Sequence, residues 1–291
     1  TEEICIYDCI EFNDRFRYGD VASEVAFLAM DLDRYRRRDL SDAFADAYAR
    51  ISGDGEIPAL MPFYKCYRAV VRGKVEGFKL GDPMIPEEER ERAKWLARTY
   101  FELARSYATG RGLLVIMSGL TGSGKSTVAE GLGRLLAGTV ISSDVVRKQL
   151  AGLSADTHQY EPYGEGIYSP EWTRHTYEEM LRQAQPVLAS AGHAILDASF
   201  LRSRERTLAV QTARQAGARA VLVECNAPHE VLMRRLRDRT ADATISDGRP
   251  EILEAQVSGR EGVVEFAEKD HISIDATQDS ETILEDLWTR L

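Results

Sequence analysis

The second half of the chain alternates short apolar runs with longer amphipathic stretches. The apolar runs are too short for helices and are typical of buried strands, while apolar residues between them recur with a helical period. This alternation predicts a parallel sheet with helices on both faces, which is a three-layer α/β fold. The expected strands cover residues 113–118, 139–143, 193–198, 218–225 and 271–275.

The first part of the chain follows a helical period almost throughout. After an extended segment at residues 4–12, apolar residues recur three or four positions apart in four stretches, which glycine–aspartate and proline breaks separate. Acidic residues directly follow Pro86, in the first turn of the last stretch, where the helix dipole favours them. We therefore expect a mostly helical domain over residues 1–110, followed by an α/β domain over 111–291.

Composition narrows the range of partners and locations. The net charge is −10, and acidic residues exceed basic ones in both parts, which argues against a broad nucleic-acid-binding surface. The arginine-rich segment 202–239 suits a bound polyphosphate as well as a nucleic acid. The four cysteines form no CxxC pair, no apolar run is long enough for a membrane helix, and the first residues lack a signal-peptide pattern. We expect a cytoplasmic protein with reduced cysteines.

Residues 119–127, GLTGSGKST, match the phosphate-binding P-loop pattern G-x-x-x-x-G-K-[ST]. A predicted strand precedes the motif and a predicted helix follows it. Glycines let backbone N–H groups turn toward phosphate oxygens, and the helix N-terminus adds its positive dipole end. We expect Lys125 to reach the β- and γ-phosphates of Mg-ATP and the Ser126 hydroxyl to bind Mg²⁺. The nucleotide-binding residues expected here are Gly119, Thr121, Gly122, Ser123, Gly124, Lys125, Ser126 and Thr127.

Two aspartates at the ends of predicted strands point to phosphoryl transfer. Asp144 follows the strand at 139–143, where a carboxylate can accept a proton from a substrate hydroxyl. Arg147, one helical turn later, can hold the substrate or the moving phosphoryl group. Asp197, near the end of the strand at 193–198, suits a metal site that acts through water. Either aspartate could instead cap the helix or turn that follows it.

Two segments are expected to border the site. Arg235 and Arg239 lie four residues apart in LMRRLRDR, on one face of a predicted helix. The polar segment TADATISDGRP that follows reads as a mobile lid, although a solvated arginine-rich helix would show the same arginine pattern. Loop 154–170 is expected to lie over the acceptor, where its tyrosines either stack on a sugar ring or base or anchor the loop. These tyrosines are Tyr160, Tyr163 and Tyr168.

Together these motifs give a resemblance that covers about 111–291. GLTGSGKST, ISSDVVRKQLAG, ILDASFL, VECNAPHEVLMRRLRDR and the closing IDAT resemble the P-loop small kinases that include gluconate kinase, the zeta toxins and the polynucleotide 5′-hydroxyl kinases. The resemblance implies that Asp144 is a catalytic aspartate and Arg147 a substrate arginine. It also implies that Arg235 lies near the adenine and Arg239 near the phosphates.

The same resemblance bears on three further places. Residues 275–277 fall where this fold wraps the adenine, so Thr277 is counted with the nucleotide-binding residues. Ser199 stands where the polynucleotide kinases often have asparagine, which implies a different substrate shelf. Nearby arginines are candidates to point into the site, and the sequence does not single one out. They are Arg202, Arg204 and Arg206.

The N-terminal segment carries a second resemblance. YDCIEFNDRFRYGDVASEVAFLAMDL and FYKCYRAVVRGKV resemble the tail of an aminoglycoside-phosphotransferase-like domain, in which a short strand carries a magnesium aspartate that Asp8 matches. That family's catalytic H-G-D loop and nucleotide-binding lobe have no counterpart here. The resemblance implies the C-terminal part of a fusion of two kinase-like domains, and we expect the helical part to be catalytically inactive.

The sequence favours a kinase that transfers the γ-phosphoryl group of Mg-ATP to a hydroxyl of a small molecule, such as a sugar, sugar acid or nucleotide-sugar. One alternative is a nucleotide-dependent switch or interaction module, which would need no acceptor-side base such as Asp144. Another is a kinase acting on polynucleotide 5′-hydroxyls or, like a toxin, on cell-wall precursors. The expected catalytic residues are Lys125, Asp144, Arg147 and Arg239, and the expected metal residues are Ser126 and Asp197.

Overall fold

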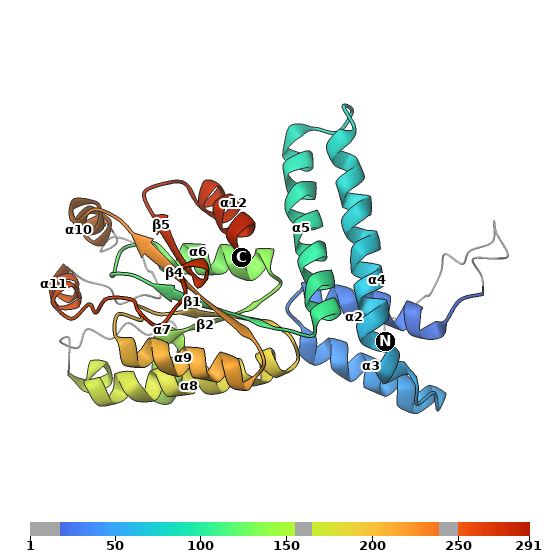
Figure 1. Ribbon diagram of the computed structural model, residues 1–291, viewed down its shortest axis with the longest axis horizontal. Coiled ribbons are helices and arrows are strands. Elements are labelled where there is room, and N and C mark those ends of the chain that lie inside the picture. Colours follow the sequence, from blue (N-terminus) through green and yellow to red (C-terminus); the bar gives the residue numbers. More distant parts are fainter. Residues whose placement is uncertain (1–17, 155–164, 239–249) are drawn as a thin grey trace. The chain divides into compact units, whose positions relative to one another are not determined.

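The computed structural model describes residues 18–154, 165–238 and 250–291. The chain divides into two compact units, a helical one at Thr1–Ala104 and a sheet-containing one at Arg105–Leu291 (Figure 1). The division falls inside one helix, shortly before the boundary expected at residue 110. Within the described ranges, no helix is both long enough and apolar enough to cross a membrane.

The first unit is built from helices whose apolar faces pack together. Asp20 caps the first of them, because its side chain accepts the Ala22 N–H at 2.9 Å. Small residues on that helix form a buried core with Ile57 and Met61 of the third. The helices are α2 (Val21–Arg34), α3 (Arg38–Ser52), α4 (Ile57–Phe78) and α5 (Glu87–Thr109), with a 3-10 turn, η1, at Lys79–Gly81.

A buried polar cluster ties three of these helices together. Lys65 on α4 donates from Nζ to Asp33 of α2 at 3.1 Å and to the Ser41 hydroxyl of α3 at 2.8 Å. Ser41 in turn donates to the Ala29 carbonyl of α2 at 2.8 Å. Mutual attraction and these hydrogen bonds offset the cost of burying the lysine and aspartate charges. The cluster therefore fixes α2, α3 and α4 against one another.

The second unit contains a five-stranded parallel sheet with the order β2-β3-β1-β4-β5. Every residue of β1 and β3 is buried, as continuous apolar runs predict for strands covered on both faces. All five expected strands are present with nearly the expected ends. The strands are β1 (Leu113–Ser118), β2 (Thr139–Ser142), β3 (His193–Asp197), β4 (Arg219–Asn226) and β5 (His271–Asp275).

Helices cover both faces of the sheet. α6 and α12 lie on one face, and α8 and α9 lie on the other with α7 beside them (Figure 1). A large core cluster lies between the sheet and α8 and α9. The helices are α6 (Lys125–Leu135), α7 (Ser143–Leu150), α8 (Pro170–Ala189), α9 (Ser203–Gln215), α10 (His229–Asp238), α11 (Pro250–Ser258) and α12 (Ser280–Arg290), with 3-10 turns η2 (Gly166–Tyr168) and η4 (Glu268–Asp270).

This architecture confirms the predicted fold class. It is a three-layer α/β P-loop fold with a parallel sheet, preceded by a helical region. In open parallel sheets, ligands bind in the crevice outside the carboxyl ends of the strands. The P-loop, Asp144 and Asp197 all follow or end strands, so the fold brings them to this one edge.

Candidate active site

The site begins where three neighbouring strands end. β1 runs directly into the P-loop, β3 ends at Asp197, and β2 ends at Ser142, whose register partner across the β2–β3 ladder is Asp197. The backbone of the segment after β3 is tied to the P-loop, because the Gly119 N–H donates to the Ser199 carbonyl at 3.1 Å. The P-loop and the segment after β3 are therefore held together at the same sheet edge.

Glycines are required at two points of the P-loop. Gly119 has a φ of 136°, and a Cβ there would lie 2.5 Å from the Cys225 carbonyl oxygen of β4. Gly124 precedes α6 as its N-cap with a φ of 86°. Both positions lie in the left-handed region that side chains rarely adopt. The loop thus turns tightly and delivers the chain into the N-terminus of α6, where an anion is favoured.

Lys125 extends across the P-loop from the first turn of α6. Its Nζ donates to the Leu120 carbonyl at 2.8 Å and lies 3.5 Å from the Ser123 hydroxyl. The ammonium group therefore stays at the mouth of the loop, next to where phosphates bind in proteins of this kind.

Ser126 and Asp197 are in direct contact. The Ser126 hydroxyl hydrogen-bonds to the Asp197 carboxylate, and Asp197 is only 7% exposed. Burial raises the pKa of Asp197, although Ser126 and the nearby Lys125 charge oppose this shift. A hydroxyl beside a carboxylate is a donor set that fits Mg²⁺, a cation that takes few protein ligands and completes its shell with water and phosphate oxygens. The described residues contain no cluster of three or more His, Cys, Asp or Glu side chains around a metal position.

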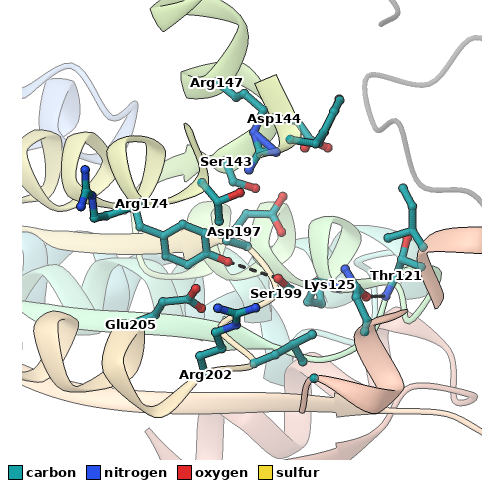
Figure 2. A pocket seen from close by; sticks show the side chains of 18 of the residues that line it. Thr121, Lys125, Ser143, Asp144, Arg147, Arg174, Asp197, Ser199, Arg202 and Glu205 are labelled. Atoms are coloured by element: carbon teal, nitrogen blue, oxygen red, sulfur yellow. Dashed lines mark hydrogen bonds between the residues drawn. The ribbon is translucent and has the colours of Figure 1, made fainter. Parts of the chain in front are cut away.

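A cavity of about 690 Å³ opens at this edge, within the size range of small-molecule sites. Figure 2 shows side chains from both sides of the site directed toward it. The structure brings eight expected residues to its wall, but Gly119, Ser123 and Thr127 are not among the lining residues. The eight are Thr121, Gly122, Gly124, Lys125, Ser126, Asp144, Arg147 and Asp197.

Asp144 does not cap α7. Ser142 holds the N-cap position, and Asp144 lies in the first turn of the helix and lines the cavity. Asp197 ends β3 with its carboxylate on Ser126, so it too has contacts beyond those of a turn residue. The N-cap interpretation of Asp144 is therefore wrong in this fold, because the helix begins two residues too early for it.

Arg147 is a buried cation on the cavity wall. Its side chain stacks over the Tyr168 ring, with 4.8 Å between the guanidinium carbon and the ring centroid. Arg147 is 8% exposed, and its Nε has no hydrogen-bond partner among the described residues. A buried guanidinium N–H without an acceptor is costly, which is a reason to expect a ligand there. This contact with Arg147 is of the loop-anchoring kind, which was one of the two roles that the sequence left open for Tyr168.

The three candidate arginines after β3 differ in whether they line the cavity. Arg202 and Arg204 line the cavity, and Figure 2 labels Arg202 among the side chains that line it. Arg206 is instead buried and paired with Glu265, to which its Nε donates at 2.9 Å. It also donates from Nη1 to the Phe200 carbonyl at 3.1 Å. Arg206 therefore supports the turn under the site and does not face the cavity.

Tyr177 of α8 is a residue that the sequence did not reveal. Its hydroxyl lies 3.2 Å from the Ser199 hydroxyl and accepts the Phe200 N–H at 3.2 Å. Burial strongly raises the pKa of Tyr177, so the phenol stays protonated at neutral pH. Phe200 has a φ of 41°, which is unusual for a bulky residue. Tyr177 thus stabilises a strained turn that carries Ser199 to the cavity.

Charged residues on α8 and α9 also line the cavity. Arg174 lies 4.0 Å from Glu171 and 3.8 Å from Glu178, and all three line the cavity. Glu205 also lines it, and its carboxylate accepts the backbone N–H of Arg202, the N-cap residue of α9. Burial raises the pKa of Glu205. The helical spacing of Arg174 and Glu178 could have marked this face, but nothing in the sequence tied it to the P-loop.

The remaining expected residues lie elsewhere. Arg235 donates from Nη2 to the Ala276 carbonyl at 2.8 Å and from Nη1 to the Gly122 carbonyl at 3.5 Å, so it links the loop after β5 to the P-loop. Thr277 donates from its hydroxyl to Asp275 at 2.7 Å. Neither Arg235 nor Thr277 lines the cavity. The expectations for Asp8, Tyr160, Tyr163, Arg239 and the TADATISDGRP segment lie outside the described residues, apart from its terminal Pro250.

Two solved structures are similar to the chain. A gluconokinase from Sinorhizobium meliloti is 19% identical with a TM-score of 0.41, and the match covers 60% of this chain and 89% of the gluconokinase. An APS kinase from Mycobacterium tuberculosis, solved with AMPPNP and APS, is 20% identical with a TM-score of 0.44, and the match covers 62% of this chain and 97% of that kinase.

Curated relatives match over a longer stretch. Uncharacterized proteins of Mycobacterium tuberculosis and Mycobacterium bovis are each 36% identical over 245 residues, which is 83% of this chain and 48% of each relative. The chain therefore spans about half the length of the curated relatives it matches. Because the sheet-containing unit begins at Arg105, a match of this length extends into the helical unit.

A family model described as an AAA domain matches residues 114–262. The matched range begins in β1 and contains the P-loop, Asp144 and Arg147 of α7, Asp197 at the end of β3, and α11. It leaves the helical unit outside. The match covers half of the chain, and the chain therefore belongs to this AAA domain family, AAA_33.

Proposed function

We propose that the sheet-containing unit is a kinase that transfers the γ-phosphoryl group of Mg-ATP to a hydroxyl of a small molecule. One observation carries the proposal. A single cavity is lined on one side by Lys125 and Ser126 of the P-loop and on the other by Asp144 and Arg147 of α7. A nucleotide switch needs only the first group, whereas a phosphotransferase needs both.

In the proposed reaction, Asp144 accepts the proton of the acceptor hydroxyl. The acceptor oxygen forms a bond to the γ-phosphorus as the bond from that phosphorus to the β–γ bridging oxygen breaks, and ADP leaves. Lys125 and the P-loop amides hold the β- and γ-phosphates, and Arg147 holds the acceptor or the moving phosphoryl group. Ser126 and Asp197 would hold Mg²⁺, which would supply charge neutralisation for the phosphates.

The acceptor side supports a polar acceptor of modest size. Arg174, Glu178 and Glu205 supply hydrogen-bond donors and acceptors around the part of the cavity beyond Asp144. Such a wall suits a sugar, a sugar acid or a nucleotide-sugar, all of which carry several hydroxyls. Arg235, which bonds to the Gly122 and Ala276 carbonyls, and Thr277, in the loop after β5, fit contacts with the nucleoside part of ATP.

A screen for phosphorylated products tests the proposal. The full chain is incubated with Mg-ATP and a metabolite library that includes sugars, nucleotide-sugars and an oligonucleotide with a 5′-hydroxyl. We expect one class of acceptor to be phosphorylated by the native chain and by neither Lys125→Ala nor Asp144→Ala. ATP binding and slow hydrolysis without any acceptor, equal in the native chain and Asp144→Ala, would favour a nucleotide switch instead.

We also propose that residues 1–110 form a separate helical domain derived from an aminoglycoside-phosphotransferase-like fold and lacking its activity. The proposal rests on the two sequence segments that carry the resemblance. The Lys125→Ala variant removes the P-loop chemistry and so isolates any activity of the helical part. We expect this variant to phosphorylate no aminoglycoside, and measurable turnover would contradict the proposal.

A further inference from the structure

Gln256 of α11 makes a contact with the P-loop that the proposed reaction has not used. Its Oε1 accepts the backbone N–H of Thr121 at 2.7 Å. Both residues line the cavity. A P-loop amide is a phosphate-binding group, so a side chain that bonds to one lies next to the phosphate position.

Apolar packing holds Gln256 in this place. Leu253, three residues earlier on α11, is fully buried in a cluster with Leu232 and Leu236 of α10, and Leu120 of the P-loop packs against that cluster. Residues three apart share one face of a helix, so the anchor at Leu253 also directs Gln256 toward the loop. The contact is thus built into the packing of α11.

The carboxamide of Gln256 also carries an NH₂ group that can donate hydrogen bonds. Its oxygen is engaged by Thr121, but its NH₂ group carries two donors, and these have no partner among the described residues. Gln256 is partly exposed, on the cavity side of α11. An oriented donor pair beside the P-loop is suited to a phosphate oxygen.

The γ-phosphoryl group is the phosphate that this donor pair can reach. The N-terminus of α6, at Lys125, marks the position of the phosphates held by the loop. The γ-phosphoryl group must extend from there into the cavity, because Asp144 and Asp197 line it. Thr121 comes earlier in the loop than the helix start and lines the same cavity, and Gln256 is bonded to it.

We propose that Gln256 binds the γ-phosphoryl group of ATP, donating from its NH₂ group while its oxygen keeps the Thr121 N–H. The assignment rests on the proposed nucleotide site and adds to it a residue that distinguishes ATP from ADP. The same contact would keep α11 against the P-loop while a triphosphate is bound.

Calorimetric binding of a non-hydrolysable ATP analogue and of ADP, both with Mg²⁺, tests this assignment on the full chain. Gln256→Glu keeps an oxygen for Thr121 but replaces the donors by a negative charge. We expect its Kd for the analogue to rise at least tenfold, about 1.4 kcal/mol, and its Kd for ADP to change less than twofold. Val257→Glu adds the same charge at a neighbouring, exposed position, and we expect it to leave both constants within twofold.

Gln256→Lys is a second variant that separates the loss of the donor from a general folding defect, because it has a hydrogen-bond donor but no oxygen for Thr121. It should retain a preference for the triphosphate analogue that Gln256→Glu loses. Equal weakening of both nucleotides by Gln256→Glu, or no weakening of either, would overturn the assignment. Because the assay needs no acceptor, its outcome is separate from that of the phosphorylation screen, which alone decides whether the chain is a kinase.

Discussion

Replacing Arg206 by methionine should destabilise the sheet-containing unit more than any other arginine substitution near the site. The Arg206 side chain is 1% exposed and that of Glu265 is 9% exposed. Arg206 makes two hydrogen bonds to Glu265, at 2.9 and 3.2 Å, and further ones to the Phe200 carbonyl at 3.1 Å and the Gly262 carbonyl at 2.6 Å. Methionine fills similar volume but leaves a buried carboxylate and two carbonyls without these donors.

The expected loss is about 3–5 kcal/mol, the usual cost of removing one partner of a buried ion pair. Arg204→Met is the matched control, because Arg204 is exposed, and it should cost less than about 0.5 kcal/mol. The double variant R206M/E265Q should recover much of the loss, since it removes the stranded charge. Urea unfolding in a Trp95→Phe background measures this unit alone, because the remaining tryptophans, Trp172 and Trp288, both lie in it.

The loss should also depend on pH in a defined direction. Burial alone would raise the pKa of Glu265, but hydrogen bonds from Arg206 and Ser203 outweigh it and hold that pKa at about 2, below the ordinary 4.5. A carboxyl with a lowered pKa in the folded state stabilises it above the ordinary pKa, and this contribution disappears as the pH falls toward 2. The cost of Arg206→Met should therefore shrink between pH 4.5 and pH 2. A cost below about 1 kcal/mol at pH 7, or one that does not change with pH, would refute the reasoning.

Three further predictions concern the site itself. Burial raises the pKa of Asp197, so its ionised form destabilises the ligand-free fold at neutral pH. Asp197→Asn should therefore raise the thermal midpoint by about 2–4 °C at pH 7, with little gain at pH 4. Calorimetry of the same variant should show that Mg²⁺ no longer tightens ATP binding. Asp144→Asn should lower kcat by about 10²–10⁴-fold in the phosphorylation assay while the Kd for ATP stays within twofold, and a similar fall in ATP affinity would contradict its acceptor-side role. Gly119→Ala should raise the Kd for ATP more than tenfold without loss of helical circular dichroism. The reason is that residue 119 has a φ of 136° and its new Cβ would lie 2.5 Å from a backbone oxygen. Unchanged binding would show that the loop tolerates the side chain.

The sequence predicts the strands and the P-loop well because both are local patterns. Buried parallel strands are continuous apolar runs, and the P-loop is one contiguous motif. Asp144 and Asp197 could also be placed, since the carboxyl ends of parallel strands meet at one edge. Asp144 and Asp197 could therefore be assigned to one site although they are more than 50 residues apart in the sequence.

Side-chain directions were harder to predict. Arg202 and Arg206 are four residues apart, which suggests one helical face, yet Arg202 is the extended N-cap of α9, with φ −105° and ψ 139°, and so falls outside the helical repeat. Tyr177 and Gln256 reach the site only through the packing of α8 and α11 against the sheet and the P-loop. Such contacts join residues far apart in the sequence, and no local pattern encodes them.

Different elements of the fold line the two sides of the cavity, so one side can be varied by mutation without changing the other. Groups expected at the nucleotide come from the P-loop, the end of β3 and α11, whereas α7, α8, the start of α9, the η2 turn and the segment after β3 supply most of the remaining wall. A directed-evolution library confined to Arg174, Glu178, Arg202 and Arg204 would therefore vary the acceptor pocket without touching the nucleotide contacts. If the proposed kinase function holds, selection from such a library should change the acceptor while the nucleotide stays the same.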